Sequence, residues 1–169
     1  GAFLGHGMGD LINIESILTK ERYKTILEDH AIPSGLRLIG PGFTLMQDKD
    51  PKHSSKLCRG FVQEKEEAGI IKHMIWPPQS PDLNPIELLW DEMDRKVRES
   101  CPTSKMEFWR VLKNTWNGIP QETINKLIAR LPRIVEKVIN CKGGFFDEKS
   151  IFTIYHFFFF NTFYIFLFM

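Results

Sequence analysis

The 169-residue sequence has few cysteines and almost no net charge. Its three cysteines, Cys58, Cys101 and Cys141, are odd in number and lie far apart, which excludes a disulfide framework and a zinc site of the CxxC type. A formal net charge of +1 and 43% hydrophobic residues exclude an acidic tail protein and a wholly disordered chain. The length corresponds to one ordinary domain, and the cysteines fit a reducing compartment.

Long hydrophobic runs are absent except at the C-terminal end. Residues 151–169 contain no Asp, Glu, Lys or Arg and hold eight of the fourteen Phe. A helix of that length could just cross the ~30 Å hydrocarbon core of a bilayer, but no basic residues flank the run and its composition also favours strands. Three interpretations stay open: a translated A/T-rich non-coding stretch, a genuine hydrophobic tail, or a membrane anchor. We expect residues 1–150 to form the fold and 151–169 to lie outside it.

The N-terminal end lacks an initiating Met, a basic segment and the hydrophobic core of a signal peptide. We therefore expect a fragment or a truncated gene model.

The charge is distributed unevenly along the chain. Residues 1–94 carry 10 basic and 15 acidic residues, whereas residues 95–142 carry 11 basic and 4 acidic ones. This division indicates either a polyanion-binding face beside a carboxylate site or ordinary solvated helix faces.

The first half of the sequence predicts alternating strands and helices. A strand is predicted over Leu11–Leu18, followed by a helix that Thr19 caps, that carries Tyr23, Ile26, Leu27 and His30 on one face, and that Pro33 and Gly35 end. A buried strand is predicted over Phe43–Asp48, then a turn at Asp50–Ser54 and a helix with Leu57, Phe61 and Val62 that stops near Gly69. A further strand is predicted over Ile70–Trp76. This order indicates an α/β architecture.

From Ser80 onward the pattern predicts helices alone. The first carries Ile86, Leu89, Trp90, Met93 and Val97 on one stripe, and the second begins with the capping-box pattern Ser104–Glu107 and carries Phe108, Trp109, Val111, Leu112 and Trp116. Gly118 and Pro120 separate it from a third helix, which Pro132 either kinks or restarts and which ends at Gly143–Gly144.

Two carboxylates occupy positions that suit a metal site. Asp48 follows a buried strand, so its side chain is expected at the carboxyl edge of the sheet, where ligand sites of open α/β sheets lie. Glu87 lies in the first turn of a helix packed by Leu89 and Trp90. Carboxylate oxygens of this kind suit Mg²⁺. Asp48 could also begin a turn and Glu87 could complete a capping box with Asn84, and these structural roles do not exclude metal binding. Asp50 is assigned to a turn and Asp82 to a loop or cap, and His53 either contacts phosphate, supports a carboxylate or is a surface residue.

Two long motifs carry a family resemblance. The segment Leu45–Lys56, LMQDKDPKHSSK, followed by Trp76–Trp90, WPPQSPDLNPIELLW, closely resembles the catalytic domain of the mariner superfamily of DDE transposases, in the branch whose third acid is Glu. The resemblance covers roughly residues 8–146. It implies a ribonuclease-H-like fold, here incomplete with its first strands missing, followed by C-terminal helices.

The resemblance also implies a chemistry and a set of partners. In such enzymes three acids bind two Mg²⁺ or Mn²⁺ ions, which support the nicking of transposon ends and the joining of the freed 3′ end to target DNA. Asp48 matches the second acid and Glu87 the third, so both are expected to be catalytic and metal-binding. DNA, a homodimer and the nucleus follow as the expected partner, assembly and location.

The sequence departs from the family at the first acid. The matched region begins after the strand that carries it, Asp10 is not a convincing substitute, and the helix-turn-helix region that reads transposon ends is not matched. We therefore expect the chain alone neither to nick nor to join DNA. Competing hypotheses are a domesticated fragment that binds DNA or another transposase chain, and a product with no function or with a membrane anchor. The candidate DNA-binding residues are Lys52, His53, Arg95, Lys96, Arg98, Arg110, Lys113, Arg130 and Arg133.

Overall fold

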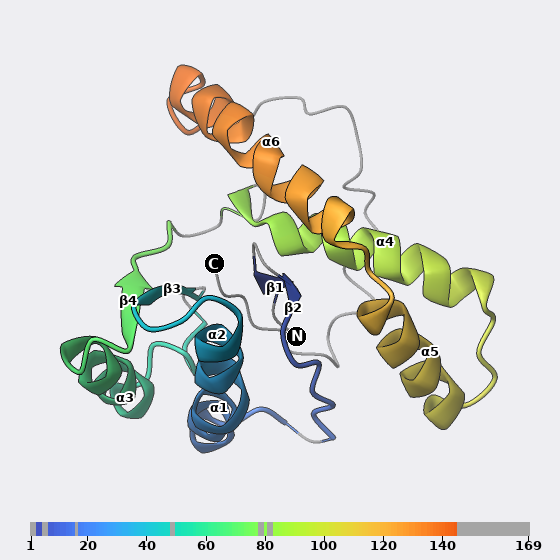
Figure 1. Cartoon of the computed structure of the whole chain (residues 1–169), viewed down its shortest axis with the longest axis horizontal. Coiled ribbons are helices and arrows are strands. Elements are labelled where there is room, and N and C mark those ends of the chain that lie inside the picture. The colour runs from blue at the N-terminus through green and yellow to red at the C-terminus, as the bar shows by residue number, and fades with distance from the viewer. Residues whose placement is uncertain are drawn as a thin grey trace. The chain divides into compact units, whose positions relative to one another are not determined.

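A computed structural model describes residues 3–4, 7–15, 17–47, 50–77, 80 and 83–144. The chain divides into two units at the boundary between Gln79 and Ser80 (Figure 1). The described part of the first unit mixes strands and helices, and that of the second contains helices without strands. The predicted change from an α/β pattern to an all-helical pattern at Ser80 is therefore confirmed.

The N-terminal segment forms only a short hairpin. Strands β1 (Phe3–Leu4) and β2 (Gly7–Met8) pair antiparallel. The predicted strand over Leu11–Leu18 is wrong, since residues 11–15 and 17–18 have no regular secondary structure. Its alternation nevertheless identifies which side chains enter the core, because Ile14 and Leu18 are buried while Ile17 is 81% exposed. Burial on one side therefore does not require a hydrogen-bonded partner strand.

The first long helical segment comprises three parts, α1 (Lys20–Ile26), the π-helical turn η1 (Leu27–Ala31) and α2 (Ile32–Leu38). The Thr19 hydroxyl caps α1 by accepting a hydrogen bond from the Arg22 amide at 3.3 Å, as predicted. The predicted end at Pro33 and Gly35 is wrong. Pro33 lies in the first turn of α2, where a missing N–H is tolerated, and the wider π turn before it relieves the clash of the ring with the preceding turn.

Gly35 serves packing between α2 and the sheet. A Cβ atom at this position would lie 2.3 Å from the ring of Phe43, which is itself buried. Only a glycine lets the helix backbone approach that ring so closely. The residue that the sequence assigned to a helix end is therefore a contact point inside the first unit.

A parallel strand pair forms the centre of the first unit. Strands β3 (Phe43–Met46) and β4 (Ile71–Met74) pair in the register Phe43 to Ile71, and α3 (Lys56–Glu67) connects them (Figure 1). Both strands and the connecting helix are predicted correctly, with shorter strands than expected. Ser55 caps α3, and Gly69 ends it with a positive φ of 70°.

One hydrophobic core holds this unit together. It joins side chains from the irregular segment, α1, η1, α2, β3, α3 and β4. The predicted face of α3 needs one correction, because Leu57 is 40% exposed and Cys58 takes the buried position instead. The core residues are Ile14, Leu18, Tyr23, Ile26, Leu27, Ala31, Ile32, Phe43, Leu45, Cys58, Phe61, Val62 and Ile71.

The second unit is built around α4 (Pro85–Glu99), which contacts both α5 (Lys105–Asn117) and α6 (Gln121–Asn140). Every residue of the predicted α4 stripe is buried, and Trp90 stacks on Trp116 of α5 at a centroid distance of 5.4 Å. The apolar face of α5 is less completely covered, since Phe108, Trp109, Val111 and Leu112 are half-buried.

The predicted helix ends of this unit are confirmed with one exception. Ser104 caps α5 by accepting from the Glu107 amide at 3.1 Å, and Gly143 follows α6 with a φ of 76°. Pro132 does not restart a helix, because α6 runs through it as one element of 20 residues.

Among the described residues, no helix combines the length and the apolar composition that crossing a membrane requires. The hydrophobic segment 151–169 and its three interpretations lie outside the described residues.

Candidate functional site

The end of β3 is fixed by side chains from two other elements. Gln47 directly follows this strand, and its Oε1 accepts a hydrogen bond of 2.6 Å from the hydroxyl of Tyr23 on α1. Gln47 Nε2 lies 3.4 Å from Nε2 of His73 on β4. Asp48, the predicted second acid, is the next residue and lies outside the described residues together with Lys49. The described structure therefore fixes the residue that leads into the predicted acid.

The turn at Asp50–Ser54, which follows Asp48 and Lys49 in the sequence, has contacts of its own. Oδ1 of Asp50 accepts a hydrogen bond of 2.8 Å from the Lys52 amide, and its Oδ2 lies 3.2 Å from the Lys52 ammonium, which confirms the assignment of Asp50 to a turn. His53 is 5% exposed and stacks on Tyr23 with ring centroids 4.0 Å apart. His53 is thus buried rather than a surface residue. Tyr23 contacts both Gln47 and His53, which flank the segment that contains Asp48.

Glu87 occupies the third position of α4. Asn84 caps this helix, its side chain accepting from the Ile86 amide at 3.4 Å, and Pro85 takes the first helical position. The predicted cap is confirmed, although its side-chain bond goes to Ile86 rather than to Glu87. Buried Ile86 and Leu89 fix this first turn against the second unit, and Glu87 is half-buried. A carboxylate at a helix N-terminus is also favoured by the helix dipole.

The structure does not test whether Asp48 and Glu87 meet. Asp48 lies outside the described residues, as does Asp82, and the two acids belong to different units. Within the described part of the chain, no three His, Cys, Asp or Glu side chains form a group that could hold a metal ion. The pairing of Asp48 with Glu87 therefore stays a prediction.

Asp10 has a different role from that of an acid in a metal site. Its carboxylate lies 3.1 Å from the Arg37 guanidinium and 3.4 Å from Nδ1 of His30, and its amide donates to the hydroxyl of buried Ser34. Partial burial alone would raise the pKa of Asp10, but the hydrogen bonds from Arg37, His30 and Ser34 outweigh that effect and lower it. Asp10 thus attaches the N-terminal segment to η1 and α2.

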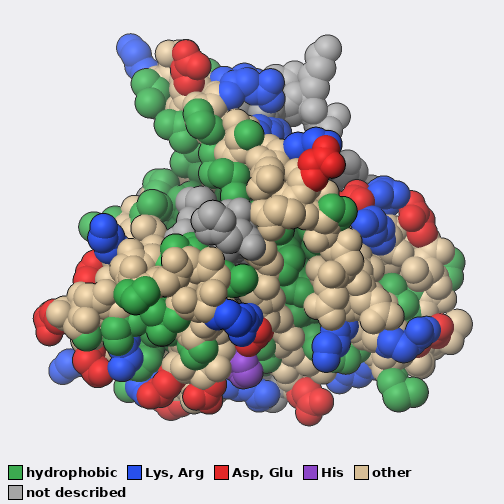
Figure 2. Space-filling model, viewed as in Figure 1, with side chains coloured by type: hydrophobic (Ala, Val, Ile, Leu, Met, Phe, Trp, Pro, Cys, Tyr) green, Lys and Arg blue, Asp and Glu red, His purple; other side chains and the backbone are tan. Residues whose placement is uncertain are grey.

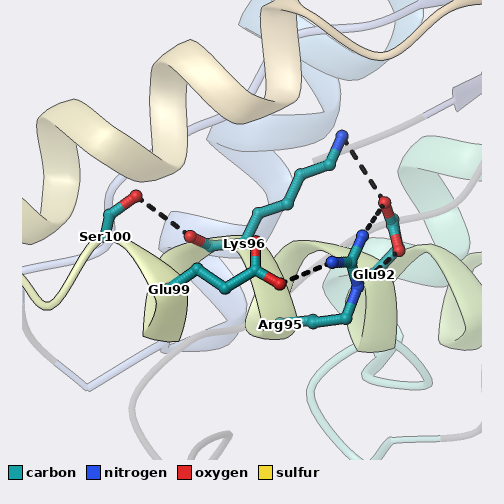
Figure 3. Close-up of polar contacts among 5 residues, drawn as sticks. All are labelled: Glu92, Arg95, Lys96, Glu99 and Ser100. Atoms are coloured by element: carbon teal, nitrogen blue, oxygen red, sulfur yellow. Dashed lines mark hydrogen bonds and ion pairs between the residues drawn. The ribbon is translucent and has the colours of Figure 1, made fainter.

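The predicted DNA-binding residues of α4 are paired with acids of the same helix (Figure 3). Arg95 binds Glu92 at 2.8 Å and Glu99 at 2.6 Å, and Lys96 lies 3.5 Å from Glu92. Arg98 contacts Asp94 at 2.7 Å. The hydrogen bond from Arg95 lowers the pKa of Glu92, against the opposing effect of partial burial. Because α4 contains five acidic and three basic residues, its cations lie within a net acidic helix.

The other predicted DNA contacts lie on the turn after β3 and on α5 and α6. Arg110 lies 3.7 Å from Glu107 one turn earlier on α5, and Lys113 is exposed on the same helix. On α6, Arg130 is half-buried and Arg133 is exposed. Contact between any of these residues and DNA, including Lys52 and His53, stays a prediction.

Sequence reasoning missed the contacts of Tyr23, Gln47 and His73. Tyr23 appeared only as one member of a helix stripe, and no local spacing connects residues that are 24 or 26 positions apart. The one available signal was the position of Gln47 between a buried strand and the predicted acid, since a polar residue there needs a hydrogen-bond partner.

The chain matches the family model described as DDE superfamily endonuclease over residues 13–108, which include Asp48 and Glu87. It is 38% identical over 143 residues to the Tc1 transposase of Caenorhabditis elegans and 35% identical over the same length to the Tcb2 transposase of Caenorhabditis briggsae. Each alignment covers 85% of this chain and 51% of the relative. The chain thus spans about half the length of these curated relatives.

Solved structures agree at the level of the fold. The catalytic domain of the Mos1 mariner transposase superimposes with a TM-score of 0.69 and 19% identity, covering 82% of this chain and 69% of that one. The same domain has been solved with Mn and with Mg, with TM-scores of 0.69 and 0.63. The fold is accordingly ribonuclease-H-like, as the motifs predict. From the match of the family model over more than half of the chain, we conclude that this chain belongs to the DDE superfamily endonucleases, and its listed relatives are transposases.

Proposed function

We propose that this chain contributes two metal-binding carboxylates, Asp48 and Glu87, to the catalytic domain of a transposase that cleaves and joins DNA strands. The observation that carries the proposal is the match over residues 13–108, which contains both acids in the order strand, helix, strand, helix. The half-buried position of Glu87 in the first turn of a well-packed helix supports it, because such a carboxylate has a fixed direction.

The donor set suits the metal that the family implies. Two carboxylates offer hard oxygen ligands, which Mg²⁺ and Mn²⁺ accept while keeping other positions for water and phosphate. A bound ion of this kind stabilises the negative charge of phosphoryl transfer and activates the attacking oxygen. Contacts of Tyr23 hold Gln47 and His53, which lie on either side of Asp48 in the sequence, and Asn84 and Pro85 begin the helix turn that carries Glu87.

Mn²⁺ binding tests the proposal directly, since its paramagnetism allows detection without catalysis. We expect the purified chain to bind Mn²⁺ and the variants Asp48→Asn and Glu87→Gln each to weaken binding by tenfold or more. Asp50→Asn serves as the matched control, because an asparagine retains the turn hydrogen bond that Asp50 makes to Lys52. Equal binding by all four proteins would contradict the assignment of the two acids.

Catalysis by the chain requires a separate assay. Two matched acids of the family's three are expected to hold metal without supporting turnover, so we expect no cleavage of transposon-end DNA in Mg²⁺. Cleavage that disappears in Glu87→Gln would contradict this expected inactivity while supporting the role of Glu87.

We also propose duplex DNA as the partner and the nucleus as the location of this chain. Structures of related proteins support DNA as the partner, since one of them is the Mos1 strand transfer complex, which superimposes with a TM-score of 0.57. A fluorescent fusion tests the location. The predicted homodimer is tested by light scattering of the purified chain, where a monomer mass at all concentrations would contradict it.

A further inference from the structure

Helix α6 carries its basic residues on one face. Lys126, Arg130, Arg133 and Lys137 follow one another at intervals of four, three and four residues, which places them in one stripe of an α-helix. Of the two buried residues of α6, Ile124 lies on the opposite side of the helix, and Ile134 borders the stripe, four residues after Arg130 and three before Lys137. Lys126 and Arg133 are exposed, and the other two basic residues are half-buried. We call these four residues the α6 basic face.

The charge of this helix differs from that of its neighbours in the second unit. Helix α6 contains four basic and two acidic residues, whereas α4 contains three basic and five acidic ones. Ion pairs within one helix occur in both, between each of the three cations of α4 and a carboxylate of α4 and between Lys126 and Glu122 of α6, so the two helices differ in their net charge. Of the basic residues of α5, Arg110 and Lys113 lie three residues apart on one face, whereas Lys105, five residues before Arg110, lies away from it.

In the space-filling view, Lys and Arg side chains gather over the part of the second unit where Figure 1 draws α6 (Figure 2). The α6 basic face extends from Lys126 to Lys137, a rise of about 16 Å along an α-helix. Duplex DNA carries about one negative charge per 1.7 Å of its axis, so a surface of this length meets enough phosphates for all four cations. Helix α6 contacts α4 and buries Ile124 and Ile134, whereas Val135 and Ile139 are exposed.

We infer that the α6 basic face is the phosphate-binding surface of this chain, and that the cations of α4 contribute little to DNA binding. This inference rests on the proposed function, because it takes duplex DNA as the partner. It also extends the predicted contact set, since Lys126 and Lys137 join Arg130 and Arg133 while Arg95, Lys96 and Arg98 leave it. When a helix contacts the phosphates of DNA, it fixes the position of the duplex but does not read its base sequence.

The test compares two variants of the full chain that each lose three positive charges. One is Arg130→Gln/Arg133→Gln/Lys137→Gln in α6, and the other is Arg95→Gln/Lys96→Gln/Arg98→Gln in α4. Affinity for a 25-base-pair duplex is measured by fluorescence anisotropy over a range of salt concentrations. We expect the α6 variant to reduce the slope of log affinity against log salt by up to about 2.7, and the α4 variant by less than about 0.9.

Equal slopes for the two variants would overturn the inference, because a general field effect depends only on the net charge. Failure of the unsubstituted chain to bind DNA would overturn both the inference and the proposed DNA partner. If the unsubstituted chain binds and only the α6 variant retains that binding, the inference alone fails. If the α6 variant lost binding to phosphatidylserine vesicles but kept its DNA binding, the α6 basic face would be a membrane-binding surface. That result would also overturn the inference.

Two further variants show whether a loss of DNA binding comes from the lost charges or from a disrupted α6. Arg130→Lys/Arg133→Lys keeps the charge, so we expect it to retain the salt slope of the unsubstituted chain. Glu122→Gln removes the carboxylate that pairs with Lys126 at 2.8 Å, and we expect two- to threefold tighter DNA binding at low salt. Weaker binding by Glu122→Gln would contradict the proposed surface.

Discussion

The two units are stabilised in different ways. In the first, seven segments contribute to one core, and polar contacts such as Tyr23 to Gln47 and Asp10 to Arg37 join segments far apart in the sequence. In the second, burial is concentrated on α4, and ion pairs such as Arg95 to Glu99, Arg98 to Asp94 and Lys126 to Glu122 join residues of the same helix. The first unit therefore depends on contacts between segments, and the second on one apolar stripe with locally balanced charges.

The largest expected effect concerns the stripe of the second unit. Trp116 is 1% exposed and stacks on Trp90, so Trp116→Ala should reduce the free energy of unfolding by about 3–5 kcal/mol. Met106 on the same helix is 82% exposed, and Met106→Ala should change that free energy by less than about 0.5 kcal/mol. Urea denaturation followed by circular dichroism measures both. Similar losses would show that α5 does not pack as described.

The next effect tests close packing in the first unit. Gly35→Ala places a Cβ atom 2.3 Å from the Phe43 ring, and overpacking of this kind costs about 1–3 kcal/mol of unfolding free energy. Gly60→Ala is the matched control in the interior of α3, where a Cβ atom meets nothing within 4 Å. That control should stabilise the chain by about 0.4–1 kcal/mol. The same denaturation experiment compares them, and a stabilising Gly35→Ala would rule out the described approach of α2 to β3.

A smaller effect concerns the beginning of α5. Ser104→Ala removes the hydroxyl that accepts from the Glu107 amide and should lower the free energy of unfolding by about 1 kcal/mol. Ser104→Asp should retain most of that stability, since aspartate caps helices about as well as serine does. An aspartate variant as unstable as the alanine variant would mean that the loss does not come from the cap.

The smallest effect is pH-dependent and belongs to the first unit. Because the folded-state pKa of Asp10 lies below its ordinary value of 3.8, its ionised form contributes stability above that pH and loses it as the pH falls through the lowered pKa. Its side chain is 39% exposed, so solvent screening keeps the contribution below about 1 kcal/mol. Asp10→Asn should remove this part of the acid dependence of unfolding, which urea denaturation at a series of acidic pH values measures. An unchanged acid profile in Asp10→Asn would contradict the contact with Arg37.

The second unit shows why its fold was predictable from sequence. The stripe of α4, the cap at Ser104 and the breaks at Gly118 and Pro120 are local signals, and the structure confirms each of them. The first unit was predicted less well because its deciding contacts are not local. The local pattern at Gly35 predicts a helix end, whereas the Phe43 ring that requires a glycine there lies eight positions away on another element.

In the candidate site too, features that depend on neighbouring residues were predictable from sequence, and contacts between distant residues were not. The cap at Asn84 and the position of Glu87 in a first turn follow from neighbouring residues, whereas the bond from Tyr23 to Gln47 joins residues 24 positions apart. Sequence also predicted cations on α4 without their partners, because the net charge of residues 95–142 leaves out Glu92 and Asp94, which bind Arg95 and Arg98. A charge count by segment cannot reveal pairs that cross its boundary.

The π-helical turn Leu27–Ala31 has a consequence for comparing this chain with its relatives. A π turn holds one residue more than an α-helical path between the same two points, so it is equivalent to a one-residue insertion absorbed without breaking the helix. The buried positions after it are shifted by that residue, and Ile32 and Gly35 face the core while His30 remains partly exposed. An alignment that places a single-residue gap inside this turn would therefore keep the buried faces of α1 and α2 in register with a relative whose helix is uninterrupted.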